Sequence, residues 1–320
     1  MPHLLQLAGV LPPFAPGALA LDRVRARHVG TLTDERRVDF SRVERCLDLL
    51  AEREDITAAT TVDEIARALL GELRDSSADG WAARAGSWID RAVRTNRGEW
   101  MDLEGTPAWA KRLEMDSLDR LNRNMGQYAG WTIEVADVLA DAPRARLCDL
   151  AAGSGGFYRC IAANPPRGPR LELRSTDMVS SYVELGRERA RRDGLDVTFE
   201  VRNALQLQDL RGAVDLFTCT QATHHLPPGL VVRMIHAAIH VAPRGIVIVD
   251  VMRGAGFMLG AVLATGMTAP HFPVMVFDGV QSVRRGFTPA EFELLARLAG
   301  AGHIETHFRK PAHVVLRASA

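Results

Sequence analysis

The residues best suited to chemistry follow a short apolar run at positions 146–150. Asp149 lies in that run, and the very small residues directly after it include Ala151, Gly153, Ser154 and Gly155. A loop of such small residues lets backbone N–H groups approach a ligand closely, because no side chain stands in the way. The sequence therefore predicts a binding loop between a strand and a helix that begins near residue 156.

The spacing of the small residues indicates which ligand the loop takes. A dinucleotide-binding loop needs a third glycine or alanine five residues after the first. Counted from Gly153, that position holds Tyr158, so a pyrophosphate ligand fits poorly. The pattern Asp149-x-Ala151-x-Gly153-x-Gly155 instead resembles the first motif of class I S-adenosylmethionine-dependent methyltransferases, with Ala151 where the first glycine usually lies. The resemblance implies S-adenosylmethionine as cofactor, with its methionine part against these small residues.

Two more polar residues end the next predicted strands, where ligands of open α/β sheets bind. Asp177 follows Gly155 by 22 residues and could accept both ribose hydroxyls. Met178 stands where the family often places an apolar residue against the adenine. Asn203 and Ala204 replace the usual Asp-Ala pair, and the Asn203 amide oxygen can still accept one hydrogen bond from the adenine amino group. A helix N-cap and a turn asparagine are the structural alternatives.

The end of the fourth predicted strand supplies the candidates for catalysis. The resemblance places Gln221 and Ala222 beside the methionyl end of the cofactor. The stretch His224-His225-Leu226 is similar to one in many bacterial small-molecule methyltransferases. Since histidine titrates near neutrality, His224 or His225 is a candidate general base for a hydroxyl nucleophile. A buried histidine that only packs the loop stays open as the alternative for both.

Substrate contacts are expected at four further residues and along one insertion. Tyr128 and Trp131 lie on the helix that leads into the first strand, and Asp250 and Arg253 follow the fifth. Core packing is the alternative for the two aromatic residues, and a structural ion pair for the two charged ones. The insertion at 254–286 predicts a lid with an apolar wall, and core packing against the N-terminal helices is the alternative. Its large apolar residues are Met258, Leu259, Met267, Phe272, Met275 and Phe277.

The pattern along the chain divides it into two regions. Residues 1–140 have helical periodicity, including one amphipathic helix over about 118–138, and are expected to cap the site, to form a homodimer, or both. Residues 141–320 alternate strands and helices, which predicts a Rossmann-like, mostly parallel α/β sheet of seven strands with an antiparallel edge strand. The strands are expected at 145–151, 171–176, 197–202, 214–219, 244–251, 303–308 and 312–318, and the helices at 156–164, 180–192, 229–241 and 288–300.

The amino-acid composition limits the classes of binding partner that this protein is expected to have. The 320 residues are 47% hydrophobic and 24% charged, and 39 basic side chains balance 39 acidic ones, so no bulk field favours nucleic acid or an anionic membrane. No stretch approaches 18 uninterrupted apolar residues, and no membrane span is expected. The four cysteines lack metal or redox spacing, so we expect free thiols, no metal site and a cytoplasmic protein.

These features together predict a methyltransferase that transfers a methyl group to O, N or C of a small, hydrophobic or aromatic molecule. Two alternatives stay open. A protein of the same fold could hold S-adenosylmethionine without catalysis, and a nicotinamide-dependent oxidoreductase is the other class, which Tyr158 disfavours.

Overall fold

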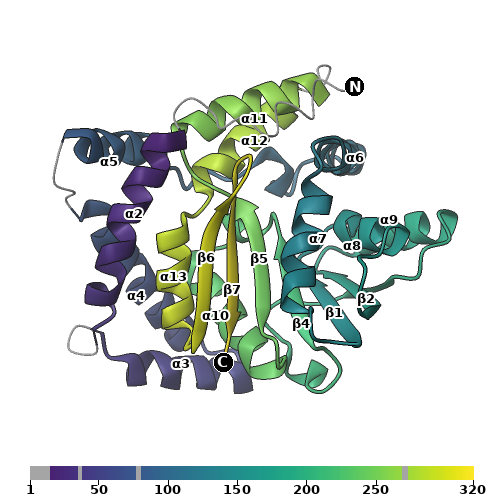
Figure 1. Ribbon diagram of the computed structural model, residues 1–320, viewed down its shortest axis with the longest axis horizontal. Helices are drawn as coiled ribbons and strands as arrows, with labels where there is room; N and C mark the ends of the chain where they lie inside the picture. Colours follow the sequence, from purple (N-terminus) through teal and green to yellow (C-terminus); the bar gives the residue numbers. More distant parts are fainter. Residues whose placement is uncertain (1–14, 35–37, 77–80, 269–272) are drawn as a thin grey trace.

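The computed structural model describes residues 15–34, 38–76, 81–268 and 273–320. Within them, seven strands form one sheet in the order β3-β2-β1-β4-β5-β7-β6 (Figure 1). The strands are β1 (Arg144–Leu150), β2 (Arg170–Asp177), β3 (Thr198–Val201), β4 (Leu216–Thr220), β5 (Ile246–Val251), β6 (His303–Arg309) and β7 (His313–Ser319). The pairs among β1 to β5 are parallel, which confirms the predicted Rossmann-like fold. The closing hairpin also forms, but β7 enters between β5 and β6, so the antiparallel strand lies one place in from the edge.

Helices occupy the N-terminal region and alternate with the strands after it. The first group is α2 (Ala15–Leu32), α3 (Phe40–Glu52), α4 (Ile56–Asp75), α5 (Trp81–Val93), the short helix η1 (Trp100–Asp102), α6 (Ala108–Asn124) and α7 (Gln127–Val138). The second is α8 (Gly156–Ala163), α9 (Ser180–Arg192), η2 (Gln208–Leu210), η3 (Thr223–His225), α10 (Pro228–Val241), α11 (Ala255–Thr268), α12 (Pro273–Arg285) and α13 (Pro289–Leu298).

The single helix predicted over 118–138 is two helices. Gly126 has a left-handed φ of 68° and separates α6 from α7. Glycine adopts this conformation without the steric cost that a Cβ would bring. The apolar periodicity continues across the break, because both helices bury residues against neighbouring parts of the molecule, and periodicity alone therefore did not reveal the change of direction.

The sheet is covered on both faces, and the N-terminal helices take part in both cores. Alternate residues of a strand point to opposite faces. Leu147 packs in one cluster with side chains of α7 and α8, whereas its neighbour Cys148 packs in another with α3, α4, α10 and α13. The regions 1–140 and 141–320 thus share hydrophobic cores, and the sheet is buried on both faces as parallel sheets require.

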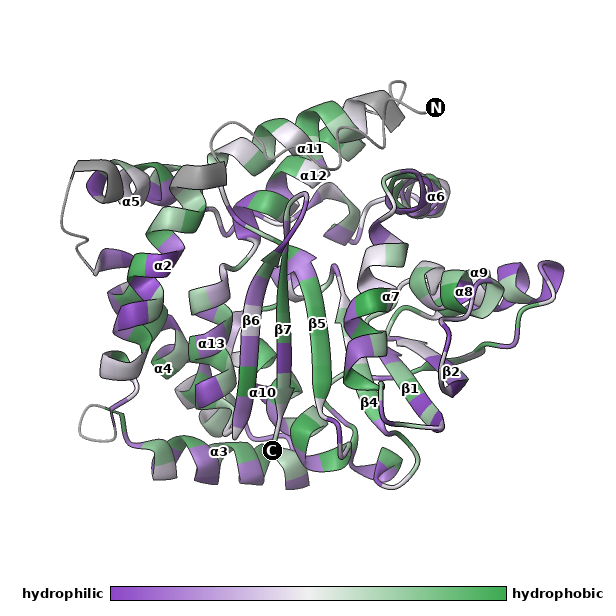
Figure 2. Cartoon of the chain, viewed as in Figure 1, coloured by the Kyte–Doolittle hydropathy of each residue, from purple (hydrophilic) through white to green (hydrophobic). Residues whose placement is uncertain are grey.

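The insertion at 254–286 forms α11 and α12, which lie beyond the carboxyl ends of β4 and β5 (Figure 1). Figure 2 shows α11 as largely hydrophobic. The side chains of Met267 and Phe272, predicted for its apolar wall, are outside the described part. Across the residues that the structure describes, no helix is both long and apolar enough to span a bilayer.

A buried network of charges ties the N-terminal helices to the sheet. Arg253, which follows β5, donates to Asp90 of α5 at 2.7 Å and to Glu291 of α13 at 2.6 Å. Arg25 of α2 bonds to Asp90 at 2.8 Å, and Arg74 of α4 bonds to Glu291 at 2.5 Å. Arg253 is 1% exposed. Its burial favours the structural ion pair that was the alternative, and the substrate contact stays a prediction.

Replacement of Arg253 by methionine tests this network. Two buried carboxylates would lose their shared cation, and breaking a buried pair from one side costs about 3–5 kcal/mol. We expect the free energy of unfolding in urea to fall by that amount. Arg297→Ala, which removes an exposed pair with Glu293 on α13, should change it by less than about 0.5 kcal/mol. Equal losses in the two variants would contradict the role of the network.

Candidate active site

The loop after β1 has the backbone that the small residues predicted. Ala151, Gly153 and Gly155 all have left-handed φ angles, of 51°, 56° and 65°. A Cβ on Gly155 would lie 2.5 Å from the Phe199 ring, so this position admits glycine alone. Ala151 occupies the position where the resemblance expects glycine, and its φ shows why glycine is usual there.

Asp177 closes this loop from the end of β2. Its carboxylate accepts the backbone N–H of Gly153 and that of Val179, each at 2.8 Å. Burial raises the pKa of Asp177. Because each carboxylate oxygen can accept a second hydrogen bond, the residue can shape the loop and still accept hydroxyls from a ligand.

Asp149 lies beneath the loop and has an unused acceptor. Oδ1 accepts the Thr218 hydroxyl at 2.6 Å, whereas Oδ2 is buried without a hydrogen-bond partner. Burial raises the pKa of Asp149 to about 7. A buried acceptor without a donor is costly, so an ammonium group that reached Oδ2 would be favoured. Ser154 is less available, because it is buried and its hydroxyl accepts a bond from Arg189 at 3.3 Å.

The residues predicted for the adenine lie at the ends of β2 and β3. The Asn203 amide oxygen accepts the N–H of Leu205 at 2.9 Å, which is the turn that the structural alternative expects. One of its two lone pairs stays available to a ligand. Ala204 packs against the core, and Met178 is 66% exposed, so only Met178 offers a free apolar side chain.

Helix α6 crosses over these loops. A Cβ on Gly153 would lie 3.2 Å from the sulfur of Met115, and Asn122 donates to the Gln221 amide oxygen at 2.8 Å. Gln221 has a left-handed φ of 52°, and Ala222 beside it is buried. The structure thus brings the β1 loop, the end of β2 and the β4 loop together, with α6 against the first and third of them.

Tyr128 and Trp131, which were predicted to contact the substrate, lie in the core of the structure. They are 5% and 1% exposed and pack with Phe157 in the core between α7, α8 and the sheet. The Tyr128 hydroxyl donates to Asp119 of α6 at 2.8 Å. Their burial favours the core alternative, and the substrate contact stays a prediction.

His224 is held on both sides by carboxylates. Its Nδ1 lies 2.7 Å from Oδ1 of Asp250, and its Nε2 lies 3.2 Å from Oε1 of Glu99. Burial opposes the charged imidazole, yet Asp250 and then Glu99 outweigh it and raise the pKa of His224 to about 10. An imidazolium with both N–H groups engaged cannot take a proton from a substrate. This arrangement does not favour the general-base role, which stays a prediction.

Asp250 is fully buried, which favours a structural role, and its substrate contact stays a prediction. Its second oxygen accepts the backbone N–H of His224 at 2.9 Å, and it also bonds to Thr223. The charge of His224 helps to lower the pKa of Asp250 to about 2, against the opposing effect of burial. It forms the structural ion pair that was the alternative, although with His224 rather than with Arg253.

His225 is more open than His224 and meets residues of the N-terminal region. Its side chain is 26% exposed, and Nδ1 lies 3.0 Å from Oδ2 of Asp102. Arg285 of α12 reaches the same Asp102 oxygen at 3.2 Å and donates to the His225 carbonyl at 2.8 Å. Nε2 of His225 lies 3.8 Å from Oε2 of Glu99.

Sequence reasoning missed Glu99 and Asp102, the carboxylates that face the two histidines from η1. Trp100 and Met101 of this short helix donate their N–H groups to Asp278 of α12, at 2.7 and 3.1 Å. Nothing in the spacing of residues 99–102 distinguishes them from a surface turn. They lie more than 120 residues before the histidines in the sequence, and only the fold brings them to the site.

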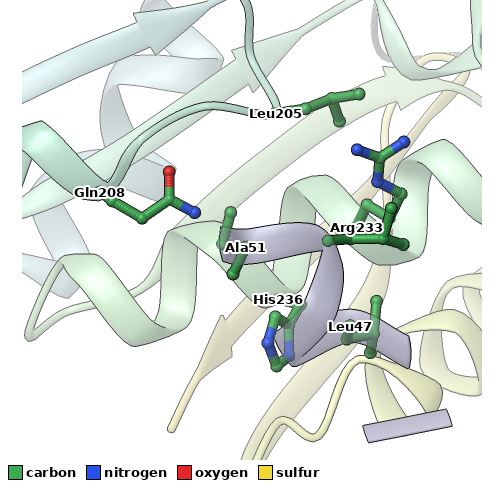
Figure 3. A pocket seen from close by; sticks show the side chains of 8 residues that line it. Leu47, Ala51, Leu205, Gln208, Arg233 and His236 are labelled. Carbon is green, nitrogen blue, oxygen red and sulfur yellow. The ribbon is translucent and has the colours of Figure 1, made fainter. Parts of the chain in front are cut away.

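The hollow in Figure 3 is not the cofactor site. It lies between α3, α10 and the segment after β3, where Leu47, Arg233 and His236 line it. Its volume of about 10 Å³ leaves room for about one water molecule. A larger groove of about 410 Å³ lies between α2, α13 and β6, away from the β1 loop.

Comparison with known proteins supports the resemblance seen in the sequence. Residues 147–245 match the model of a methyltransferase domain family. The chain is also similar to a demethylmenaquinone methyltransferase of Deinococcus radiodurans, with 34% identity over 104 residues. That alignment covers 32% of this chain and 42% of the relative, so the chain matches less than half of the length of this curated protein.

Solved structures similar to this chain include the magnesium protoporphyrin IX methyltransferase of Synechocystis with bound SAH. It is 14% identical, with a TM-score of 0.43 over 69% of this chain and 91% of that one. The plantazolicin methyltransferase in complex with SAH is 15% identical, with a TM-score of 0.45 over 78% and 79%. The family match to residues 147–245 thus lies on a sheet whose strand order agrees with the predicted Rossmann-like fold.

Proposed function

We propose that this protein is an S-adenosylmethionine-dependent methyltransferase that acts on a small, hydrophobic or aromatic molecule. The observation that carries the proposal is the left-handed loop after β1, tied by the Gly153 N–H to the carboxylate of Asp177. Three positive φ angles in five residues hold N–H groups and small side chains against the space beyond the sheet.

The residues fit the proposed cofactor. Asp177 keeps free lone pairs for the ribose hydroxyls, and the buried Oδ2 of Asp149 lacks the donor that the methionyl ammonium group would bring. Met178 offers its exposed side chain to the adenine. When bound, the cofactor would supply an electrophilic methyl group; the protein would orient the acceptor and exclude water, and positioning alone can contribute about 7–11 kcal/mol.

The insertion supports an apolar acceptor. Leu259, Leu263 and Phe277 are 45%, 57% and 40% exposed on α11 and α12, although most large apolar residues of a folded chain are buried. A patch of such residues beside a binding site commonly meets an apolar ligand or partner. Because α11 also contacts α6, this surface borders the helix that crosses the proposed cofactor site.

Binding of S-adenosylmethionine by an Asp177→Ala variant tests the cofactor site. Loss of two hydrogen bonds to a charged acceptor, each worth about 1.5–3 kcal/mol, should weaken binding at least about 100-fold by isothermal titration calorimetry. Asp196→Ala, an exposed aspartate beyond α9, is the matched control and should bind like the unmodified protein.

Because Asp177 also holds the loop, thermal melting of the Asp177→Ala and Asp177→Asn variants must accompany the titration. The asparagine keeps one oxygen for the loop N–H and should melt close to the unmodified protein while binding the cofactor more weakly. Unchanged affinity in both folded variants would refute the proposed cofactor site.

The affinity for S-adenosylmethionine should depend on pH through Asp149. Its pKa of about 7 in the free protein must fall when an ammonium group binds beside it, so binding releases a proton and strengthens as pH rises. Between pH 6 and 7.5, below the range of about 7.7–8.0 where an α-amino group titrates, we expect Kd to fall about fivefold. Asp149→Asn should flatten this dependence. An equal slope in both proteins would show that another group is responsible.

Methyl transfer to simple phenols or amines, followed by mass spectrometry, separates the enzyme from a protein that only binds the cofactor. Transfer of a methyl group to any of them would exclude the non-catalytic alternative. A fluorescence titration with a nicotinamide cofactor tests the oxidoreductase alternative, and we expect no binding there because Tyr158 fills the position of the third glycine.

A further inference from the structure

We propose that Glu99, His224 and His225 form a binding site for a divalent transition metal ion, with Zn²⁺ as the best fit. The sequence predicted no metal site, because its cysteines lack ligand spacing. The fold brings a carboxylate of the N-terminal region against both imidazoles of η3.

The distances among the three side chains suit one ion. Nε2 of His224 lies 3.2 Å from Oε1 of Glu99, and Nε2 of His225 lies 3.8 Å from Oε2. One candidate ligand atom of each residue lies within 4.8 Å of the other two. Ligands at about 2.0–2.1 Å from a tetrahedral zinc ion are roughly 3.3–3.4 Å apart. The His225–Glu99 separation is too long for a hydrogen bond and is close to what two ligands of a shared ion need.

Each histidine is oriented as metal-binding histidines are. A ligand imidazole usually donates its second N–H to a carboxylate, which fixes the ring and strengthens the ligand nitrogen. Here Nδ1 of His224 faces Asp250 at 2.7 Å, and Nδ1 of His225 faces Asp102 at 3.0 Å. Both Nε2 atoms therefore point toward Glu99, and the Nε2 proton of His224 must leave before an ion binds there. A structural salt bridge needs only one histidine whose Nδ1 faces a carboxylate, whereas here two successive histidines have this pairing.

Glu99 is also held in place. The hydroxyl of Ser282 donates to its Oε1 at 2.7 Å, and the backbone of η1 is anchored on Asp278. Ser282 and Asp278 both belong to α12, so this helix fixes the carboxylate before any ion binds. Preorganised ligands of this kind lower the cost of ordering a metal site.

The charges around the ligand atoms favour a divalent cation. A bound ion displaces the Nε2 proton of His224, and with both imidazoles then neutral, Glu99, Asp102 and Asp250 each carry a negative charge, whereas Arg285 beside Asp102 carries a positive one. The ligands and the groups bonded to them then hold two net negative charges. Glu99 and Asp250 are buried, where uncompensated charge is costly, and a divalent ion would balance it.

Three protein ligands leave a coordination position open, as in catalytic rather than structural zinc sites. The histidines follow Gln221 and Ala222, which lie beside the proposed methionyl site. A hydroxyl of the acceptor bound at the open position would lose its proton more readily, because a metal ion stabilises the oxyanion. This role rests on the proposed methyl transfer, whereas the metal site itself does not.

Titration of the metal-free protein with ZnSO4 alone, without S-adenosylmethionine, tests the site directly. Calorimetry should show one zinc ion per chain. Loss of a residue that only supports a metal ligand weakens binding by up to about 100-fold. Because Glu99 and His225 are proposed as ligands themselves, Glu99→Gln and His225→Ala should each weaken zinc binding by at least that factor. His240→Ala is the matched control, since His240 stacks on His236 at 4.2 Å between ring centroids, as His224 does on His225, but lies on α10. It should leave the zinc affinity unchanged.

Circular dichroism melts of each variant confirm that weaker binding does not come from unfolding, and the shape-conserving Glu99→Gln variant serves where His225→Ala fails to fold. Absence of zinc binding to the unmodified protein would overturn the proposal. So would equal zinc affinity in Glu99→Gln, His225→Ala and the unmodified chain. A protein that binds zinc but not S-adenosylmethionine would refute the proposed function and leave the metal site standing.

Discussion

The buried charges around Arg253 fix the N-terminal helices on the sheet, and the site depends on that attachment. Asp90 and Glu291 both pair with the guanidinium of Arg253. Asp90 also pairs with Arg25, and Glu291 also pairs with Arg74, so four helices and the end of β5 meet at one point. Such a network gains little stability over an apolar core of the same size, but it is costly to break. It therefore defines one arrangement of the helices rather than many.

This arrangement places residues of the N-terminal region over the carboxyl edge of the sheet. Helix α5 carries Asp90 and leads directly into the segment with Glu99, and α6 then crosses the β1 loop near Gly153. The sheet supplies the loops that the cofactor needs, and the N-terminal helices supply the carboxylates opposite the histidines. Neither region alone contains the groups that surround the space between them, which explains why they share hydrophobic cores.

The sequence predicted the elements whose signals are local. Strand and helix alternation after residue 140 located all seven strands, and the small residues after Asp149 located the loop. It did not reveal contacts between side chains that are distant in the chain. Tyr128 and Trp131 have the types of substrate contacts but are buried by α8, and Arg253 is buried by helices more than 150 residues earlier. Glu99 showed no pattern, because its meaning comes only from the histidines that the fold brings to it.

The two histidines illustrate why residue type alone does not assign a catalytic role. His224 resembles a general base in the sequence, but a base needs a free lone pair near the substrate, and both of its nitrogens face carboxylates. The same pairing of Nδ1 with a carboxylate makes a histidine a stronger metal ligand. The carboxylate behind each ring suits either role, whereas Glu99 opposite both Nε2 atoms strengthens the case for an ion between the rings. With an acceptor bound to it, the proposed ion would promote the ionisation that His224 or His225 was predicted to promote as a general base.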